Sequence, residues 1–333
     1  MSRVAIAGAG LTGCLLAVRM AEAGNTADVF DRRPDLRVDD VDAGRSINLA
    51  LSTRGLDALA RIGLDAAVLE HAIEMPGRMI HDIDGNVTFQ PYGAEPDHVL
   101  QSVNRDGLNI ALLDAVDATA GAEVHFNHRV RDLSVTRGDL TFERGDGRHH
   151  ENFDVVFGCD GAYSAVRGRL QRIGRVDFSQ SFLSHGYKEL SIPAAADGSH
   201  RLDPHALHIW PRGSHMMLAL PTPDGSFTCT LFWPFDDTVG FDTVSTGADM
   251  RRVCGEQFPD ANALMPELEH EYEHNPTSSL VTMRTGPWHH DGRALLLGDA
   301  AHAIVPFLGQ GANAALEEVT ILRDLYGYFG AVY

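Results

Sequence analysis

The sequence has few basic residues for its length, and this limits its partners. Lys and Arg total 27 against 46 Asp and Glu in 333 residues, a formal net charge of −19. A general nucleic-acid-binding protein needs a basic face that neutralises phosphates, so we expect no nucleic-acid partner. Long apolar runs are also missing, because Gly8, Gly10, Gly13 and Arg19 interrupt the first candidate, residues 4–23. We therefore expect neither a membrane span nor a signal peptide, and a soluble, cytoplasmic protein.

Cysteine is scarce and scattered. The four cysteines form no C-x-x-C pair, which favours reduced, mostly buried side chains over a zinc site, and we expect no metal. Histidine is more frequent, but the neighbours of His149-His150 and His289-His290 indicate solvated loops rather than metal ligands. The composition, with 44% hydrophobic residues, is typical of a globular protein. The length of the chain suits one large domain or two closely packed ones.

The segment after Arg3 carries a dinucleotide-binding pattern. An apolar strand, residues 4–7, runs into G-A-G-L-T-G, which fits G-x-G-x-x-G, and a helical pattern follows over residues 14–23. Gly8 allows the tight turn, Gly10 lets a pyrophosphate approach, and Gly13 lets the helix pack on the strand. The phosphates then meet the free N–H groups of the helix N-terminus.

A second strand, residues 27–30, ends at Asp31, which can accept hydrogen bonds from a ribose. This motif alone does not distinguish FAD from NAD(P).

Two further strand–turn–helix patterns follow. Residues 155–158 lead to Asp160-Gly161 and a helix that Ser164 and Arg167 open, which alone is an ordinary arrangement. Residues 294–297 lead to Asp299, and Gly309-Gln310-Gly311 form a turn before a helix over 313–325. A second helix N-terminus directed at one ligand indicates a long cofactor with more than one polar region. The Gly-Asp segment argues against a dehydrogenase that uses only nicotinamide.

Together, the three motifs resemble the single-component FAD monooxygenases of the p-hydroxybenzoate hydroxylase fold. Within that class the chain is similar to the kynurenine 3-monooxygenase family along nearly its whole length. The W-x-W-x-I-P motif of the related flavin halogenases is absent. The similar segments are residues 44–64, 75–82, 89–93, 102–113, 186–190, 207–213, 224–235 and 299–314.

The resemblance implies an α/β fold: a Rossmann-like FAD-binding domain of the glutathione reductase (GR2) type with an inserted antiparallel β-sheet substrate domain. The β-rich composition of residues 205–235, punctuated by Pro and Gly, independently predicts antiparallel strands. We expect the FAD-binding domain to be discontinuous. It would comprise residues 1–72, 101–174 and 281–333, and the substrate domain would comprise residues 73–100 and 175–280.

The resemblance also implies which residues contact FAD. The first turn would hold the pyrophosphate, Asp299 the ribityl chain, and the backbone of Ala312 and Asn313 the isoalloxazine ring. The complete predicted set is Gly8, Gly10, Thr12, Gly13, Asp31, Arg32, Arg33, Ala50, Arg105, Asp160, Asp299, Gly311, Ala312 and Asn313.

In such enzymes NADPH reduces FAD, oxygen adds as a flavin C4a-hydroperoxide, and one oxygen atom is transferred to the aromatic ring. The substrate would be L-kynurenine or a substituted kynurenine, giving a 3-hydroxykynurenine in tryptophan catabolism or a derived biosynthetic pathway. The resemblance places the carboxylate contact on Arg78, assisted by Tyr92, and a pocket wall on Pro306 and Phe307. Because the cofactor carries the chemistry, no side chain is expected to be catalytic.

Each of these side chains also has a purely structural interpretation. Arg78 fits a solvated strand-edge arginine, Tyr92 a turn aromatic after Pro91, and the segment at Pro306-Phe307 an apolar loop on the core. His302, beside Asp299, is expected to be a structural histidine that bonds to loop carbonyls.

The resemblance weakens at the C-terminus. Family members usually continue with a helical segment that supplies an asparagine and a tyrosine to the substrate pocket, and residues 326–333 do not resemble it. This predicts a substrate site open on one side and a second copy of the chain as a partner. The alternative function is a truncated FAD-binding homologue without efficient hydroxylation, either an uncoupled NADPH oxidase or a non-catalytic flavin-binding protein.

Overall fold

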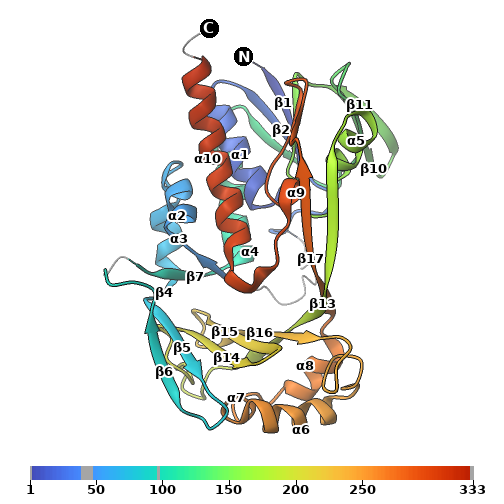
Figure 1. The fold of residues 1–333 in the computed structure, drawn as a ribbon. Helices are drawn as coiled ribbons and strands as arrows, with labels where there is room; N and C mark the ends of the chain where they lie inside the picture. The colour runs from blue at the N-terminus through green and yellow to red at the C-terminus, as the bar shows by residue number, and fades with distance from the viewer. Residues whose placement is uncertain (1, 39–47, 96–97, 331–333) are drawn as a thin grey trace.

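The computed structural model describes residues 2–38, 48–95 and 98–330, with side chains up to residue 325, and consists of two lobes (Figure 1). Residues 44–47 of the first family-like segment lie outside the described residues. We call the part around the six-stranded sheet the upper lobe, and the part around the seven-stranded sheet the lower lobe. No helix in the described part of the chain is long and apolar enough to cross a membrane.

The upper lobe is built on a mostly parallel sheet of order β18-β19-β12-β1-β2-β8. Its central strands are buried on both faces, as strands of a parallel sheet are when helices and a second sheet cover them. Helices α1, α4 and α10 cover one face (Figure 1), while the three-stranded sheet β11-β10-β9 and α5 cover the other. The bounds are β1 Arg3–Ala7, α1 Leu11–Glu22, β2 Thr26–Phe30, α4 Arg105–Ala118, β8 Ala122–His125, β9 Arg129–Ser134, β10 Asp139–Arg144, β11 Gly147–Asn152, β12 Val155–Gly158, α5 Ala165–Ile173, β18 His289–His290, β19 Ala294–Leu296 and α10 Gln310–Gly330.

The two histidine pairs were expected in solvated loops, and this was wrong. His149 and His150 belong to β11, and His289 and His290 form β18. The polar neighbours that suggested loops belong to edge strands, whose outer faces meet water.

The lower lobe is a seven-stranded sheet of order β17-β13-β16-β15-β14-β5-β6, antiparallel except for the β14–β5 pair. Helices α6, α7 and α8 cover its outer face, and its inner face is turned toward the upper lobe (Figure 1). This confirms the predicted α/β class with an inserted antiparallel sheet. The bounds are β5 Gly77–His81, β6 Val87–Pro91, β13 Asp177–Ile192, β14 Leu207–Arg212, β15 His215–Pro221, β16 Phe227–Pro234, α6 Gly247–Gln257, α7 Pro259–Asn262, α8 Leu268–His274 and β17 Thr277–Gly286.

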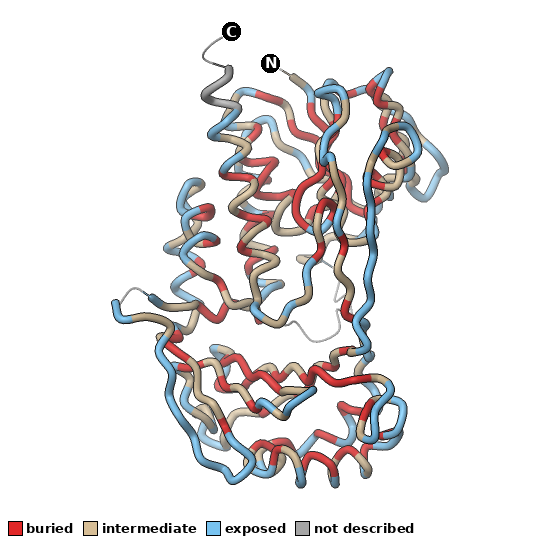
Figure 2. Tube along the Cα trace, in the orientation of Figure 1, coloured by how far each residue is buried: buried red, intermediate tan, exposed pale blue. Residues whose placement is uncertain are grey.

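The lobes are connected by a pair of long strands on one side and by a small sheet on the other. The long strands β13 and β17 pair along both lobes, and the part of β13 beside the upper lobe is exposed (Figure 2). On the opposite side, a small sheet of order β3-β7-β4 lies between the lobes, and α2 and α3 lie beside the upper lobe (Figure 1). The bounds are β3 Asn48–Leu51, α2 Thr53–Ala60, α3 Asp65–Glu70, β4 Ile73–Met75, β7 Leu100–Asn104, α9 Asp299–His302 and η1 Pro306–Leu308.

Candidate flavin and substrate site

The first glycine-rich turn has the geometry of a phosphate cradle. Gly8 has a φ of +99°, and a Cβ at Gly13 would lie 1.9 Å from the Gly8 carbonyl oxygen. A Cβ at Gly10, by contrast, would meet nothing within 4 Å. Helix α1 begins directly after Gly10 without a side-chain cap, so its first N–H groups face this open space. An anionic group fits here without displacing protein atoms.

Asp31 directly follows β2 and hydrogen-bonds to the glycine-rich turn. Its buried carboxylate accepts hydrogen bonds from the backbone N–H of Ala9 and Arg33, each at 2.8 Å, and from the Arg33 side chain. Burial opposes ionisation, yet the Arg33 hydrogen bonds lower the pKa of Asp31. Arg32 is exposed. Asp31 therefore braces the glycine turn in addition to the ribose contact predicted for it.

The second and third motifs meet the first one in space. A Cβ at Gly298, just before Asp299, would lie 3.1 Å from the Thr12 hydroxyl. Asp160 accepts the Ala165 N–H at 2.7 Å through one oxygen, while its other oxygen is buried and has no partner among the described residues. Burial raises the pKa of Asp160. An acceptor left unpaired in this way fits a ligand hydroxyl.

The charge of Arg105 acts on two carboxylates, those of Asp299 and Glu189. Asp299 is open to solvent, although the protein packed around it raises its pKa by desolvation, which the charge of Arg105 opposes. Glu189, on β13, has its pKa raised to about 7 by burial, again opposed by Arg105. The sequence prediction missed Glu189, although its segment, residues 186–190, was among those that carry the family resemblance.

The N-terminus of α10 is fastened to β3 by one side chain. Asn313 is fully buried, accepts the Ser52 N–H at 2.8 Å and donates to the Ala50 carbonyl at 2.9 Å. Two residues predicted separately as cofactor contacts, Ala50 and Asn313, are thus brought together. The helix starts at Gln310, so Gly311 and Ala312 belong to its first turn rather than to a preceding loop.

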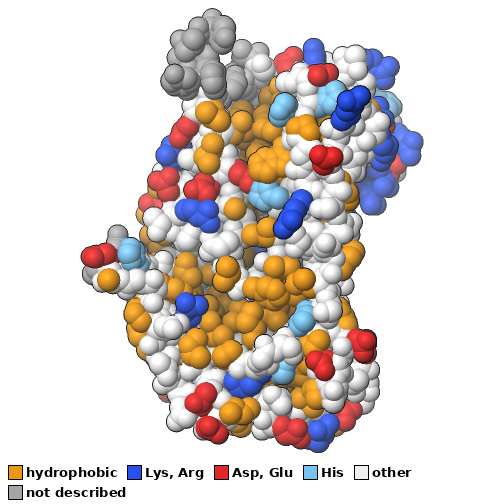
Figure 3. Space-filling view, viewed as in Figure 1, with side chains coloured by type: hydrophobic (Ala, Val, Ile, Leu, Met, Phe, Trp, Pro, Cys, Tyr) orange, Lys and Arg blue, Asp and Glu red, His pale blue; other side chains and the backbone are white. Residues whose placement is uncertain are grey.

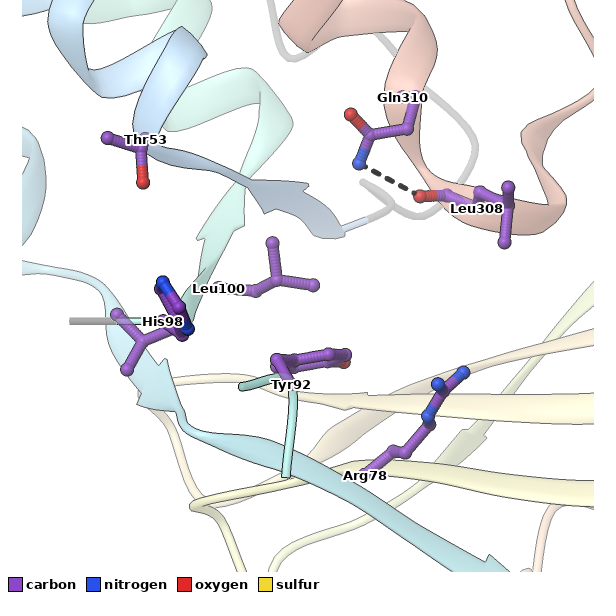
Figure 4. Close-up of a pocket in the computed structure, with 8 residues that line it drawn as sticks. Thr53, Arg78, Tyr92, His98, Leu100, Leu308 and Gln310 are labelled. Atoms are coloured by element: carbon purple, nitrogen blue, oxygen red, sulfur yellow. Dashed lines mark hydrogen bonds between the residues drawn. The ribbon is translucent and has the colours of Figure 1, made fainter. Parts of the chain in front are cut away.

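A cavity of about 370 Å³ lies between this helix N-terminus and the lower lobe (Figure 4). Arg78 from β5 and Tyr92 after β6 both point into it, with the Arg78 guanidinium carbon 5.8 Å from the Tyr92 ring centre. The Nε of Arg78 and the hydroxyl of Tyr92 are buried and have no hydrogen-bond partner in the described ranges. Burial raises the pKa of Tyr92 to about 12, so it is a neutral donor. The lining residues are Thr53, Arg78, Tyr92, His98, Val99, Leu100, Leu308 and Gln310.

The segment from Pro306 to Gln310 forms the upper wall. Leu308 and Gln310 line the cavity, whereas Pro306 and Phe307 are not among its lining residues. Phe307 instead packs edge-to-face on Phe232 of the lower sheet, with ring centres 5.1 Å apart. Hydrophobic side chains gather on this face between the lobes around a hollow (Figure 3).

His302 has a structural partner. It hydrogen-bonds to Glu318 on α10, whose other oxygen accepts the Gly298 N–H at 2.8 Å. The prediction of a structural histidine placed its bonds on loop carbonyls, and the partner is a carboxylate instead. This pair holds the Asp299 turn against α10.

The His302–Glu318 pair predicts a pH-dependent stability. The Glu318 hydrogen bond raises the pKa of His302, so its stabilisation is present below the unfolded-state pKa and is lost as the pH rises through the folded-state pKa. Glu318→Gln should lower the free energy of unfolding at acidic to neutral pH by about 1.4 kcal/mol per unit of raised pKa, and little at alkaline pH. Urea titrations at several pH values measure this. Glu317→Gln is the control, because Glu317 pairs with Arg54 and not with a histidine. If Glu318→Gln lowered the stability equally at every pH, the His302–Glu318 pair would not be the source of the pH dependence.

Comparison with known proteins agrees with this geometry. A family model described as an FAD binding domain matches residues 1–325. The chain is 48% identical to "Kynurenine 3-monooxygenase" of Myxococcus xanthus, over 97% of this chain and 70% of that protein. It is 44% identical to the protein of the same name of Dictyostelium discoideum, over 97% of this chain and 69% of that one.

Solved structures share the fold at lower identity. The tetrameric form of 2-methyl-3-hydroxypyridine-5-carboxylic acid oxygenase superposes with a TM-score of 0.78 at 22% identity, covering 97% of this chain and 81% of that one. PqsL of Pseudomonas aeruginosa superposes with a TM-score of 0.77 at 20% identity, covering 97% of this chain and 85% of that one. The family model and these relatives together show that the chain is a flavoprotein monooxygenase that binds FAD. Within that class, the chain belongs to the kynurenine 3-monooxygenase family.

Proposed function

We propose that this protein hydroxylates L-kynurenine, or a ring-substituted kynurenine, to the 3-hydroxy product with bound FAD, NADPH and O2. The observation that carries the proposal is the Arg78 guanidinium, whose buried Nε has no hydrogen-bond partner among the described residues, beside the neutral Tyr92 hydroxyl in one cavity below the N-terminus of α10. Arginine offers a planar fork that matches a carboxylate, and the phenol adds one donor. An amino acid with an aromatic tail fits this arrangement, since the apolar Val99, Leu100 and Leu308 lie around the charged end.

The residues present fit FAD. The open cradle at Gly10 would hold the pyrophosphate, Asp31 the ribose, and the unpaired oxygen of Asp160 a hydroxyl of the cofactor. Asp299 would accept from the ribityl chain, and the first turn of α10 would donate N–H groups to the flavin ring. When bound, FAD supplies the redox chemistry that couples NADPH oxidation to oxygen activation.

The protein's own contribution is then orientation and exclusion of water. Arg78 and Tyr92 would fix the amino-acid end of kynurenine and so place its ring toward α10. The aromatic amine of kynurenine donates electron density to the ortho carbon, which makes that carbon the acceptor of the oxygen atom. The apolar side chains that line the cavity would limit the access of water to the reacting atoms.

Product analysis tests the proposal. The FAD-loaded protein, incubated with NADPH, oxygen and L-kynurenine, should form 3-hydroxykynurenine in proportion to the NADPH consumed, as measured by chromatography with mass detection. The alternative, an uncoupled NADPH oxidase or non-catalytic flavin-binding protein, predicts hydrogen peroxide or no turnover. Stoichiometric peroxide without a hydroxylated product would refute hydroxylation and leave flavin binding intact.

A further inference from the structure

A chain of hydrogen bonds crosses the lower lobe behind the cavity. His81, the last residue of β5, contacts Asp260 of α7 through Nδ1 at 2.7 Å and His208 of β14 through Nε2 at 2.8 Å. His208 contacts the carbonyl oxygen of Asp203 through Nε2 at 2.8 Å. Both imidazole rings are almost completely buried. The chain therefore runs from a carboxylate through two histidines to a backbone carbonyl.

The three hydrogen bonds need more protons than two neutral imidazole rings can supply. The Asp203 carbonyl accepts only, so His208 Nε2 must carry a proton. One proton must lie between the two rings, and one between His81 and Asp260, because each of these short contacts needs a donor. Two neutral imidazoles carry two ring protons, whereas the three bonds require three. The third proton balances the Asp260 charge, so the buried group is neutral overall.

The surroundings place the additional proton on His81. Burial works against ionisation of Asp260, but bonds from His81 and Trp210 lower the pKa of Asp260 to about 2, so it is ionised. Burial lowers the pKa of His208 to about 4, so it is neutral. His81 also stacks on Trp210 with ring centres 4.2 Å apart, an arrangement that favours a cation over the indole face.

Arg212 is the other cation near these hydrogen bonds, and its charge interacts with that of Asp260. Arg212 of β14 donates to the carbonyls of His81 at 2.9 Å and Asp82 at 3.0 Å. The Asp82 and Asp203 carboxylates lie at the periphery, where each is part of an exposed turn. The carboxylate that helix α7 presents to the imidazole rings is that of Asp260, which contacts His81.

We propose that His81 is a buried imidazolium, held between Asp260 and neutral His208, that positions Arg78 for the substrate carboxylate. Side chains alternate along a strand, so Arg78 faces the cavity while His81 faces α7. β5 pairs with β14 over only three residue pairs, and β6 beyond it is exposed. The His81 bonds therefore fasten the strand that carries Arg78. The positioning role rests on the proposed function, whereas the protonation state does not.

Nitrogen NMR of the histidine-labelled protein tests the protonation state directly, with His81→Asn and His208→Asn used to assign signals. At neutral pH we expect both ring nitrogens of His81 to be protonated, and only Nε2 of His208. A His81 ring with a single proton would overturn the proposal, whatever the enzyme's activity.

Kinetics test the positioning role. Asp260→Asn removes the balancing charge and should raise the KM for kynurenine about tenfold with a smaller change in kcat, while Asp260→Glu retains most of the affinity. The control is Asp236→Asn, an exposed acid outside the network, which should leave KM unchanged. If Arg78→Ala raised the KM and Asp260→Asn left it unchanged, the positioning role alone would be overturned. If kynurenine did not stimulate NADPH oxidation in the wild type or in any variant, the proposed function would be refuted instead.

Discussion

Arg78→Ala is expected to raise the KM for kynurenine by one to two orders of magnitude while FAD stays bound. The substitution removes a charge-assisted hydrogen-bonding partner of the substrate carboxylate, which is worth about 1.5–3 kcal/mol. Arg78 lies on β5, away from the glycine turn, so the flavin content should not change. Steady-state kinetics and the flavin absorbance of the purified protein measure the two effects separately.

Two further variants sharpen this test. Arg78→Lys keeps the charge but loses the planar fork, so its KM should lie between those of the wild type and Arg78→Ala. Arg172→Ala, on the exposed part of α5, removes an arginine far from the cavity and should leave KM unchanged. A wild-type KM in Arg78→Ala would rule out the carboxylate contact.

Gly10→Val should abolish flavin binding while the fold is retained. A Cβ at Gly10 meets nothing within 4 Å, so the folded protein has room for a side chain there. The room it fills is the space that the pyrophosphate needs beside the N-terminus of α1. The purified variant should be colourless and show no FAD binding by fluorescence quenching, with a circular dichroism spectrum like that of the wild-type apoprotein.

Gly145→Val is the matched control for this substitution. Gly145 lies in the turn between β10 and β11, where a Cβ likewise meets nothing within 4 Å. We expect this variant to bind FAD normally. If Gly10→Val retained FAD with unchanged affinity, the phosphates would have to lie elsewhere.

The parts of the fold set by local sequence could be predicted. The strand, glycine turn and helix after Arg3 follow from spacing alone, because Gly8 and Gly13 meet steric demands of the turn and Gly10 leaves room for a ligand. The antiparallel strands at residues 207–234 follow from β-rich composition between turns. The start of α10 at Gln310 was harder to predict, since Gly309 and Gly311 both indicate a turn and only Gly309 adopts the left-handed conformation.

The contacts that shape the site depend on tertiary packing. His81 meets His208 and Asp260 across 127 and 179 positions of the chain, and no local pattern specifies such partners. Glu189 owes its raised pKa to burial between the lobes, which the strand alone does not specify. Arg78 and Tyr92 could be selected only through the family resemblance, because they converge through the pairing of β5 with β6.

The bonds of Asn313 to Ser52 and Ala50 also bear on how the chain folds during synthesis. They span 261 and 263 positions, and α10 packs against both α1 and α2. Helix α1 therefore leaves the ribosome long before α10, the helix that completes its burial. We expect the early β1–α1–β2 unit to remain only loosely ordered until α10 emerges, and this lobe to fold only after residues 310–330 have been translated rather than segment by segment.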